Sequence, residues 1–261
     1  MVTRTRVTRA RDDTPGTEVD SGRDAGAVSG EAAAHIGLVA ALSWEVRPLL
    51  RQQSGVEKNK PGYSFLVQGV PVHLSVAGVG AENAYRESRR LLERFRVRGL
   101  VTIGFAGGLA DSLNPGDIVL ADHIFDQRTG QRFECSGELW PVKNAHRGAL
   151  LSATEVITSA AEKRNLAGQW GAVAVDMESV GVARAAAESG VEFAAIKAIT
   201  DTSMQSISFD FAHCRSDDTR LSIWKIAREG MRTAQTMRDL WMLARGARVA
   251  ARALAATLGS I

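Results

Sequence analysis

Short runs of apolar and β-branched residues alternate along the chain with segments in which apolar residues recur at helical spacing. Gly, Asn and Pro separate these segments at short intervals. The short runs predict strands, and the spaced pattern predicts helices. The predicted strands cover residues 36–41, 63–68, 72–77, 100–105, 116–122, 149–152, 171–177 and 193–199. The predicted helices cover residues 82–95, 159–166, 179–189 and two segments after about residue 219, which separate near residues 229–230.

This alternation of strands and helices predicts an α/β fold. Residues 126–147 show no clear period and are interpreted as a loop. Residues 1–30 carry five Arg and five acidic residues with almost no large apolar side chain, so this segment cannot bury enough surface to fold. We therefore expect a disordered polar tail over residues 1–33 and a single domain over residues 34–261.

The composition narrows the class of protein. Hydrophobic residues make up 45% of the chain and charged residues 23%, with two isolated cysteines that have no histidine at metal-ligand spacing. No stretch approaches the roughly 18 consecutive apolar residues of a membrane span, and the first 33 residues lack the apolar core of a secretory signal. We expect a cytoplasmic protein without a zinc site.

Basic residues are concentrated near the C-terminal end. Residues 220–261 hold eight basic and two acidic side chains, whereas the whole chain has a formal net charge of +3. We favour a helix that packs on the domain with a solvated arginine face. The alternative is a helix that lies on an anionic membrane surface through Trp241 and its apolar neighbours. No nucleic-acid-binding motif accompanies the charge, so we expect no nucleic-acid partner.

Polar groups follow three of the predicted buried strands, where open α/β sheets place their ligands. They lie in the segments 40–46 (AALSWEV), 175–179 (VDMES) and 199–202 (ITDT), and the glycine-rich segment 104–108 (GFAGG) lets main chain approach a flat ligand closely. Taken singly, Glu45 and Glu178 could be solvent-exposed acids in the first turns of helices. Asp201 could be an N-cap or turn residue.

Other ligand-binding motifs are incomplete. Gly78 and Gly80 precede a predicted helix, but Asn83 stands where the dinucleotide fingerprint has glycine. There is no Walker lysine motif, and the five histidines show neither HxxxH nor HExxH spacing. We therefore expect no cofactor and no metal.

Taken together, the segments resemble the purine nucleoside phosphorylase and methylthioadenosine/S-adenosylhomocysteine nucleosidase superfamily. IGLVAALSWEV, AGVGAENA, IGFAGGL with LNPGDIVLAD, VAVDMESVGVA and IKAITDTS occur in the family's order and spacing over residues 35–205. VDMES, ALSWEVRP and the short segment 126–147 look most like the hopanoid-associated branch, whose members cleave adenine from adenosylhopane. The resemblance implies a three-layer α/β/α domain with a central mixed sheet, a purine nucleoside ligand, and a homodimer or higher homo-oligomer.

The resemblance also implies roles for individual residues. Glu45 matches the glutamate that activates the attacking water, and Asp201 matches the aspartate that protonates purine N7. Met177 and Glu178 match the pair that holds the ribose, and Ile157 matches a main-chain contact to the base. The remaining substrate-binding candidates are Phe105, Ala106, Gly107, Val156 and Thr200.

The chemistry of these residue types agrees with the implied roles. Cleavage of the C1′–N9 bond develops negative charge on the purine, so the base must be protonated as it leaves. Asp201 follows the apolar run 193–199, where burial favours a protonated carboxyl. Glu45 must stay ionised to take a proton from water, so we expect the two acids to titrate apart. Glu178 offers two oxygens to two ribose hydroxyls, and Met177 packs on the sugar.

The attacking group decides between hydrolysis and phosphorolysis. The hexameric phosphorylases of this fold place an arginine where this chain has Glu45, and a carboxylate there repels phosphate. We therefore expect hydrolysis by water. One alternative is a phosphorylase in which Arg47 turns inward to bind phosphate, and another is a nucleoside-binding protein without catalytic activity.

Two positions depart from the nucleosidase pattern. Phe105 replaces a small hydroxyl residue, and Val156 replaces the phenylalanine that stacks on the purine. Phe105 either supplies this stacking from across the pocket or belongs to the core. The acid at position 201 favours a 6-aminopurine, since the guanine-preferring trimeric relatives use asparagine there. We expect a nucleosidase that releases adenine from a 5′-substituted nucleoside, similar to methylthioadenosine, S-adenosylhomocysteine or adenosylhopane.

Overall fold

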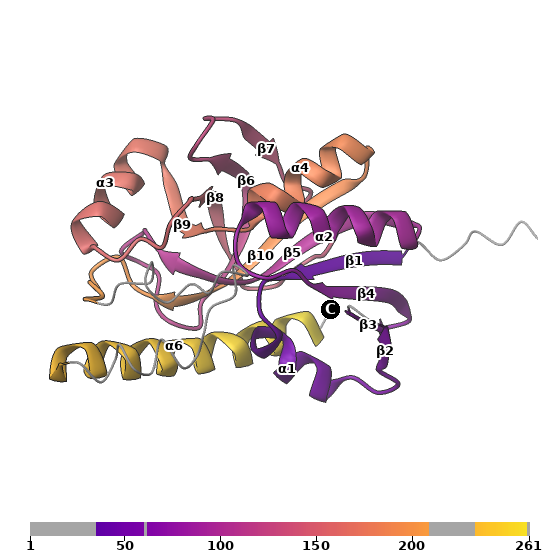
Figure 1. Ribbon diagram of the computed structural model, residues 1–261, viewed down its shortest axis with the longest axis horizontal. Coiled ribbons are helices and arrows are strands. Elements are labelled where there is room, and N and C mark those ends of the chain that lie inside the picture. The colour runs from indigo at the N-terminus through magenta and orange to yellow at the C-terminus, as the bar shows by residue number, and fades with distance from the viewer. Residues whose placement is uncertain (1–34, 60–61, 209–232, 260–261) are drawn as a thin grey trace, which may run out of the picture. The chain divides into compact units, whose positions relative to one another are not determined.

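The computed structural model describes residues 35–59, 62–208 and 233–259 (Figure 1). The chain divides after Ala32 into two units. The first unit, and with it the predicted polar tail, lies outside the described residues, as does the whole of the first predicted C-terminal helix. Every element described below belongs to the second unit, Ala33–Ile261.

The sequence pattern locates most of the elements. All eight predicted strands and the four predicted helices that fall on described residues are present. The strands are β1 (His35–Ala40), β2 (Glu57–Asn59), β3 (Gly62–Val67), β4 (Val70–Val76), β5 (Val97–Gly108), β6 (Ile118–Asp126), β7 (Arg132–Glu134), β8 (His146–Ser152), β9 (Ala172–Asp176) and β10 (Glu192–Asp201). The helices are α1 (Ser43–Gln52), α2 (Ala81–Arg94), α3 (Ala160–Trp170), α4 (Ser179–Ser189) and α6 (Ala234–Gly259).

The strands form one mixed sheet, part of which closes on itself. The described strands pair in the order β10-β6-β8-β9-β5-β1-β4-β3-β2, with β7 beside β6 and a further pairing of β10 with β5. β5, β10, β6, β8 and β9 therefore form a ring. The ring closes where Gly107 and Gly108 of β5 face Val175 and Ala174 of β9. This closure brings the ends of β5, β9 and β10 together, and these ends carry the candidate site residues.

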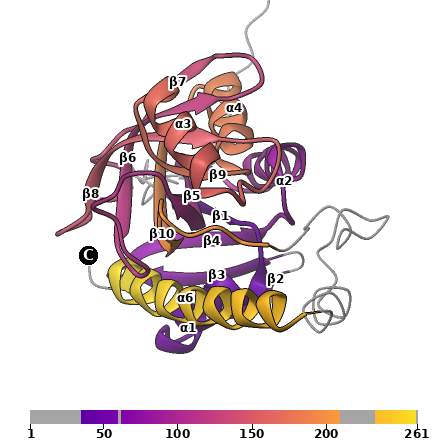
Figure 2. The ribbon, with the colours of Figure 1, turned by 90° about the vertical axis from the view of Figure 1, so that its left-hand side faces the viewer.

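Helices cover both sides of the sheet, so the predicted three-layer arrangement is confirmed (Figure 1 and Figure 2). α2 and α4 pack on each other over one face, and α1 and α6 pack on each other over the opposite face. The approach of α2 to α4 depends on Gly181, where a Cβ would lie 2.0 Å from the Ala81 carbonyl oxygen. α4 ends as predicted at Gly190, which has a φ of +65° that favours glycine.

The C-terminal helix α6 packs on the domain along its second half. Ala250, Leu254 and Leu258 are fully buried against α1 and the sheet. Trp241 and Met237, in the first half, are largely exposed. The favoured interpretation of a packed helix therefore holds for the second half, while the contact with a membrane surface stays a prediction. Within the described ranges, no helix combines the length and apolar character that a membrane crossing requires.

The structure differs from the sequence analysis in a few elements. β5 continues to Gly108, three residues beyond the predicted end at residue 105, and Gly104 within it adopts a φ of +139°. The expected loop 126–147 contains β7, a three-residue strand that is too short to show a period and is held by pairing with β6. α1 and β2 were not predicted; α1 contains Pro48 and follows β1 almost directly.

Candidate active site

A cavity of about 350 Å³ opens where the ends of β1, β5, β9 and β10 meet. All ten candidate site residues from the sequence analysis line it: Glu45, Phe105, Ala106, Gly107, Val156, Ile157, Met177, Glu178, Thr200 and Asp201. The convergence follows from the topology, since β1, β5 and β10 are parallel neighbours and end at the same edge. Sequence positions as far apart as 45 and 201 therefore share one site.

Glu45 lies in the first turn of α1 but is buried instead of solvent-exposed. Its Oε2 accepts a hydrogen bond from the Leu42 N–H at 3.1 Å. A Cβ at Gly104 would lie only 2.9 Å from the same oxygen. The glycine on β5 therefore makes the space in which the carboxylate sits, which explains why this strand carries glycine at a buried position.

Burial and a like charge change the protonation of the carboxylates. Burial, assisted by the charge of Glu178, raises the pKa of Glu45 from 4.5 to about 8. Burial, assisted by Asp176, raises the pKa of Glu178 to about 7. Glu178 also accepts a hydrogen bond from the Gly80 N–H at 2.8 Å. The expectation that Glu45 stays ionised is therefore wrong for the free protein at neutral pH, because the sequence does not show how deeply this side chain is buried.

A buried lysine lies behind these carboxylates. Lys197 Nζ is 2.9 Å from Asp176 Oδ2 and donates to Thr102 Oγ1 at 3.1 Å. Burial by itself would lower the pKa of Lys197, but the charges of Asp176 and Glu178 outweigh burial and raise it. Lys197 thus supplies the positive charge that keeps a cluster of acids together in the interior. Neither Lys197 nor Asp176 is among the predicted site residues, although a lysine within the apolar run FAAIKAI is a signal of a paired, buried cation.

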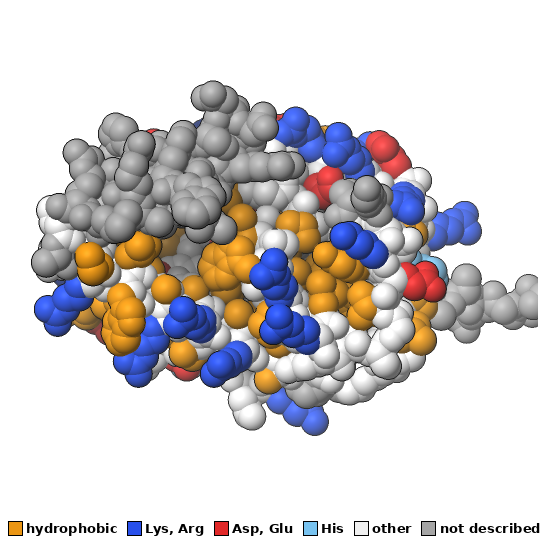
Figure 3. Space-filling view, turned by 60° about the horizontal axis from the view of Figure 1, so that its bottom comes forward, with side chains coloured by type: hydrophobic (Ala, Val, Ile, Leu, Met, Phe, Trp, Pro, Cys, Tyr) orange, Lys and Arg blue, Asp and Glu red, His pale blue; other side chains and the backbone are white. Residues whose placement is uncertain are grey.

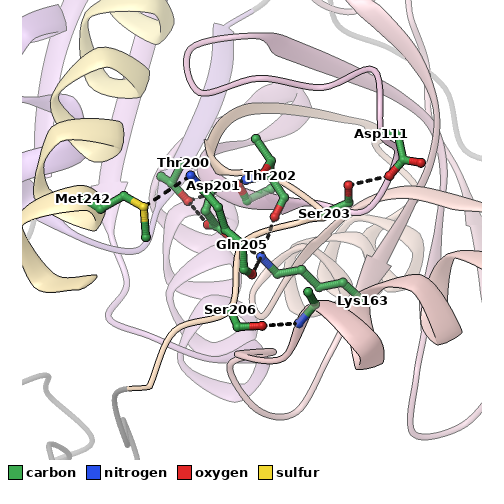
Figure 4. Close-up of polar contacts among 11 residues, drawn as sticks. Asp111, Lys163, Thr200, Asp201, Thr202, Ser203, Gln205, Ser206 and Met242 are labelled. Carbon is green, nitrogen blue, oxygen red and sulfur yellow. Dashed lines mark hydrogen bonds and ion pairs between the residues drawn. The ribbon is translucent and has the colours of Figure 1, made fainter. Parts of the chain in front are cut away.

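The surroundings of Asp201 also differ from the expectation. We expected an apolar environment, but Asp201 Oδ2 accepts a hydrogen bond from the buried ammonium of Lys163 (Figure 4). Asp201 Oδ1 accepts a hydrogen bond from Thr200 Oγ1 at 2.6 Å. Nothing in the sequence marks Lys163, because it stands in the run Glu162-Lys163-Arg164, which is typical of an exposed helix surface.

The remaining wall of the cavity is apolar. Phe105 is partly buried and its ring lies against Trp44, with 5.0 Å between the ring centroids. α6 contributes Leu240 and Leu243 to the lining. Phe105 therefore lines the cavity and also packs against the core, and its stacking on a purine stays a prediction. The face that carries α1 and α6 shows apolar side chains interspersed with Lys and Arg (Figure 3).

Arg47, the residue on which the phosphorylase alternative depends, does not line the cavity. Its side chain is exposed on α1. The described lining contains no Lys or Arg, and five of its residues are acids: Glu45, Glu155, Asp176, Glu178 and Asp201. The electrostatic environment of the described lining therefore disfavours an anionic second substrate.

Two known proteins share sequence with most of the domain. The 5′-methylthioadenosine/S-adenosylhomocysteine nucleosidase of Buchnera aphidicola subsp. Baizongia pistaciae is 25% identical over 197 residues, which cover 64% of this chain and 78% of that protein. The enzyme of the same name from Thermotoga maritima is 26% identical over 174 residues, covering 60% of this chain and 80% of that protein.

Solved structures show the same fold. The structure of 5′-methylthioadenosine/S-adenosylhomocysteine nucleosidase from S. pneumoniae with a transition-state inhibitor has a TM-score of 0.65 at 18% identity, and the match covers 87% of this chain and 99% of that one. Futalosine hydrolase of Helicobacter pylori has a TM-score of 0.64 at 17% identity, with coverage of 88% and 99%.

A family model adds the decisive comparison. The model described as the phosphorylase superfamily matches residues 35–143 and 134–221, which is more than half of the chain. The matched residues include the ends of β1, β5, β9 and β10 that line the cavity. This chain therefore belongs to the phosphorylase superfamily.

Proposed function

We propose that this protein is a purine nucleosidase that hydrolyses the N-glycosidic bond of a 5′-substituted adenine nucleoside. One observation carries the proposal: three carboxylates, Glu45, Glu178 and Asp201, reach one cavity from three different strand ends, and the described lining holds no basic side chain. Carboxylates in this number suit a reaction that develops positive charge on a sugar. The nucleosidase names of the relatives support the same reaction.

The three carboxylates divide the chemistry between them. Asp201 passes a proton to purine N7 as the C1′–N9 bond breaks, and Glu45 accepts a proton from the water that attacks C1′. Glu178 accepts hydrogen bonds from the two ribose hydroxyls, and Met177 packs on the sugar. Because Glu45 must be ionised to act as the base, the active fraction of the enzyme grows as the pH rises toward 8.

Water, and not phosphate, is the attacking group in this proposal. Phosphate needs cationic or main-chain donors, whereas the described lining presents five acids and does not include the exposed Arg47. A phosphorylase remains the second candidate on the basis of the family alone. The two activities differ in their products, which are free sugar for hydrolysis and a sugar 1-phosphate for phosphorolysis.

The substrate side of the proposal rests on the cavity walls. The aromatic pair Trp44 and Phe105 and the α6 residues Leu240 and Leu243 offer apolar surface beside the acids. We propose adenine as the base and an apolar 5′ substituent, for which methylthioadenosine and adenosylhopane are the test compounds. S-Adenosylhomocysteine carries a charged 5′ substituent, so it tests whether the cavity prefers a charged group at this position instead.

A panel of nucleosides tests the function directly. Base release is measured from adenosine, methylthioadenosine, S-adenosylhomocysteine, inosine, futalosine and adenosylhopane, with and without phosphate. We expect adenine without any need for phosphate, and losses of at least 100-fold in Glu45→Gln and Asp201→Asn. Glu82→Gln, whose side chain is exposed on α2, is the matched control and should keep the wild-type rate.

Two outcomes of this assay would change the proposed activity. Release that requires phosphate would identify a phosphorylase. Binding of a nucleoside without release of its base would identify a nucleoside-binding protein. We also propose a cytoplasmic homo-oligomer, most simply a homodimer, and a monomeric mass in analytical ultracentrifugation would contradict the oligomer.

A further inference from the structure

The ammonium of Lys163 has three hydrogen-bond acceptors, and one of them belongs to the candidate general acid. Lys163 is fully buried. Its Nζ donates to Asp201 Oδ2, to the Thr202 carbonyl oxygen at 2.8 Å and to the Gln205 carbonyl oxygen at 3.1 Å (Figure 4). An ammonium has three N–H donors, so every donor of this side chain is engaged.

The position of Lys163 in α3 is unfavourable for a cation. α3 starts at Ala160, with Ser159 as its N-cap, so Lys163 lies at the first turn. The N-terminus of a helix carries partial positive charge that repels a cation, and burial adds a desolvation cost. An apolar side chain of similar volume would fill this space without either cost. The lysine is therefore better explained by what it does for Asp201 than by the stability of α3.

Asp201 is held on both of its oxygens. Oδ2 contacts Lys163, and Oδ1 accepts a hydrogen bond from Thr200 Oγ1 at 2.6 Å. The neighbouring strand leaves no extra room, since a Cβ at Gly107 would lie 3.3 Å from Oδ2. The carboxyl group is thus fixed in orientation at the wall of the cavity. The N7 of an adenine nucleoside is an acceptor, so Asp201 needs a proton before it can bind N7 productively.

We propose that Lys163 is a positioning residue for Asp201, which fixes its carboxyl group and supplies the proton that Asp201 passes to N7. This inference rests on the proposed function. As the C1′–N9 bond breaks, its electron pair goes to the purine, and one proton moves from Lys163 Nζ to the Asp201 carboxylate and from Asp201 to N7, which leaves Lys163 neutral and Asp201 ionised. Water adds to C1′ and gives its proton to Glu45. Solvent then returns one proton from Glu45 to Lys163, which restores the starting charges.

The test compares four variants with the nucleoside that the wild type cleaves fastest. We expect Lys163→Met to lower kcat at least 100-fold and to change KM less than threefold, because Lys163 does not line the cavity. Lys163→Arg keeps a cation but cannot give up its proton, so its kcat should fall to a similar extent. A lysine that only supports α3 would instead raise KM.

A double variant, Lys163→Met/Asp201→Asn, distinguishes a loss of proton transfer from a failure to fold. Lys163→Met leaves the buried carboxylate of Asp201 without its cation, which can prevent folding. Lys163→Met/Asp201→Asn removes that charge as well, and we expect its kcat to lie within threefold of Asp201→Asn alone.

The outcomes that overturn the inference are distinct from failure of the proposed function. A wild-type kcat in Lys163→Met or in Lys163→Arg would overturn it, and so would a double variant at least tenfold slower than Asp201→Asn. A wild type that releases no base from any nucleoside would overturn the proposed function first, and the inference with it.

Discussion

The substitution Glu45→Gln should stabilise the free protein at alkaline pH, although it removes the proposed general base. The pKa of Glu45 is about 8 in the folded protein, against 4.5 for an ordinary glutamate. Between these two pH values the folded protein binds a proton that the unfolded chain releases. The contribution of Glu45 to the free energy of unfolding is therefore fully present below pH 4.5 and is lost as the pH rises toward 8.

The magnitude follows from the same pKa. A rise from 4.5 to about 8 corresponds to a cost of about 5 kcal/mol for the ionised side chain, at about 1.4 kcal/mol for each tenfold change in proton affinity. At pH 8, where about half of the side chains are ionised, the loss is about 4 kcal/mol. Glutamine carries no charge and keeps an oxygen for the Leu42 N–H, so it avoids this loss.

Urea unfolding of wild type and Glu45→Gln at pH 5 and pH 8.5, without nucleoside, measures the effect. We expect similar free energies of unfolding at pH 5, and at pH 8.5 a variant that is more stable by about 4 kcal/mol. Glu82→Gln, on the exposed side of α2, should match the wild type at both pH values. An equal difference between wild type and Glu45→Gln at both pH values would refute the reasoning.

Three further predictions concern the activity and the strands around the site. The kcat/KM for base release should rise between pH 6 and 8.5, because Glu45 and Glu178 must lose protons whose pKa values are about 8 and 7; initial rates across this range that stay flat would contradict the assignment. Gly104→Ala should cost about 1–3 kcal/mol in thermal unfolding and lower kcat, since the residue has a φ of +139° and its Cβ would press on Glu45 Oε2. Arg47→Ala should leave base release unchanged within twofold with and without phosphate, and a loss seen only with phosphate would favour the phosphorylase.

Several parts of the site could be read from local sequence. The apolar runs that become β1, β9 and β10 are each followed by a carboxylate. Open α/β sheets place their ligands at the carboxyl ends of strands, so the sequence predicts that Glu45, Glu178 and Asp201 share a cavity, and they do. The glycine after Ser189 marked the end of α4 because a helix terminates readily at a residue with positive φ.

The protonation of the acids could not be read in this way. It depends on burial and on charges that come from distant parts of the chain. Glu45 is influenced by Glu178, which is 133 residues away in sequence, and both face Lys197. From local sequence Glu45 is an ordinary glutamate, and only the packed structure shows the burial that raises its pKa to about 8.

The sequence by itself thus determined most of the elements, their order and ten of the residues that line the cavity, because strand and helix periodicity and the carboxyl ends of strands are local properties. The tertiary structure alone decided the closure of the sheet into a ring, the pairing of Lys163 with Asp201 and of Lys197 with Asp176, and the apolar wall that α6 provides. These features depend on distances between segments that are far apart along the chain. A lysine in a helix or a strand looks the same in sequence whether it faces water or a buried carboxylate.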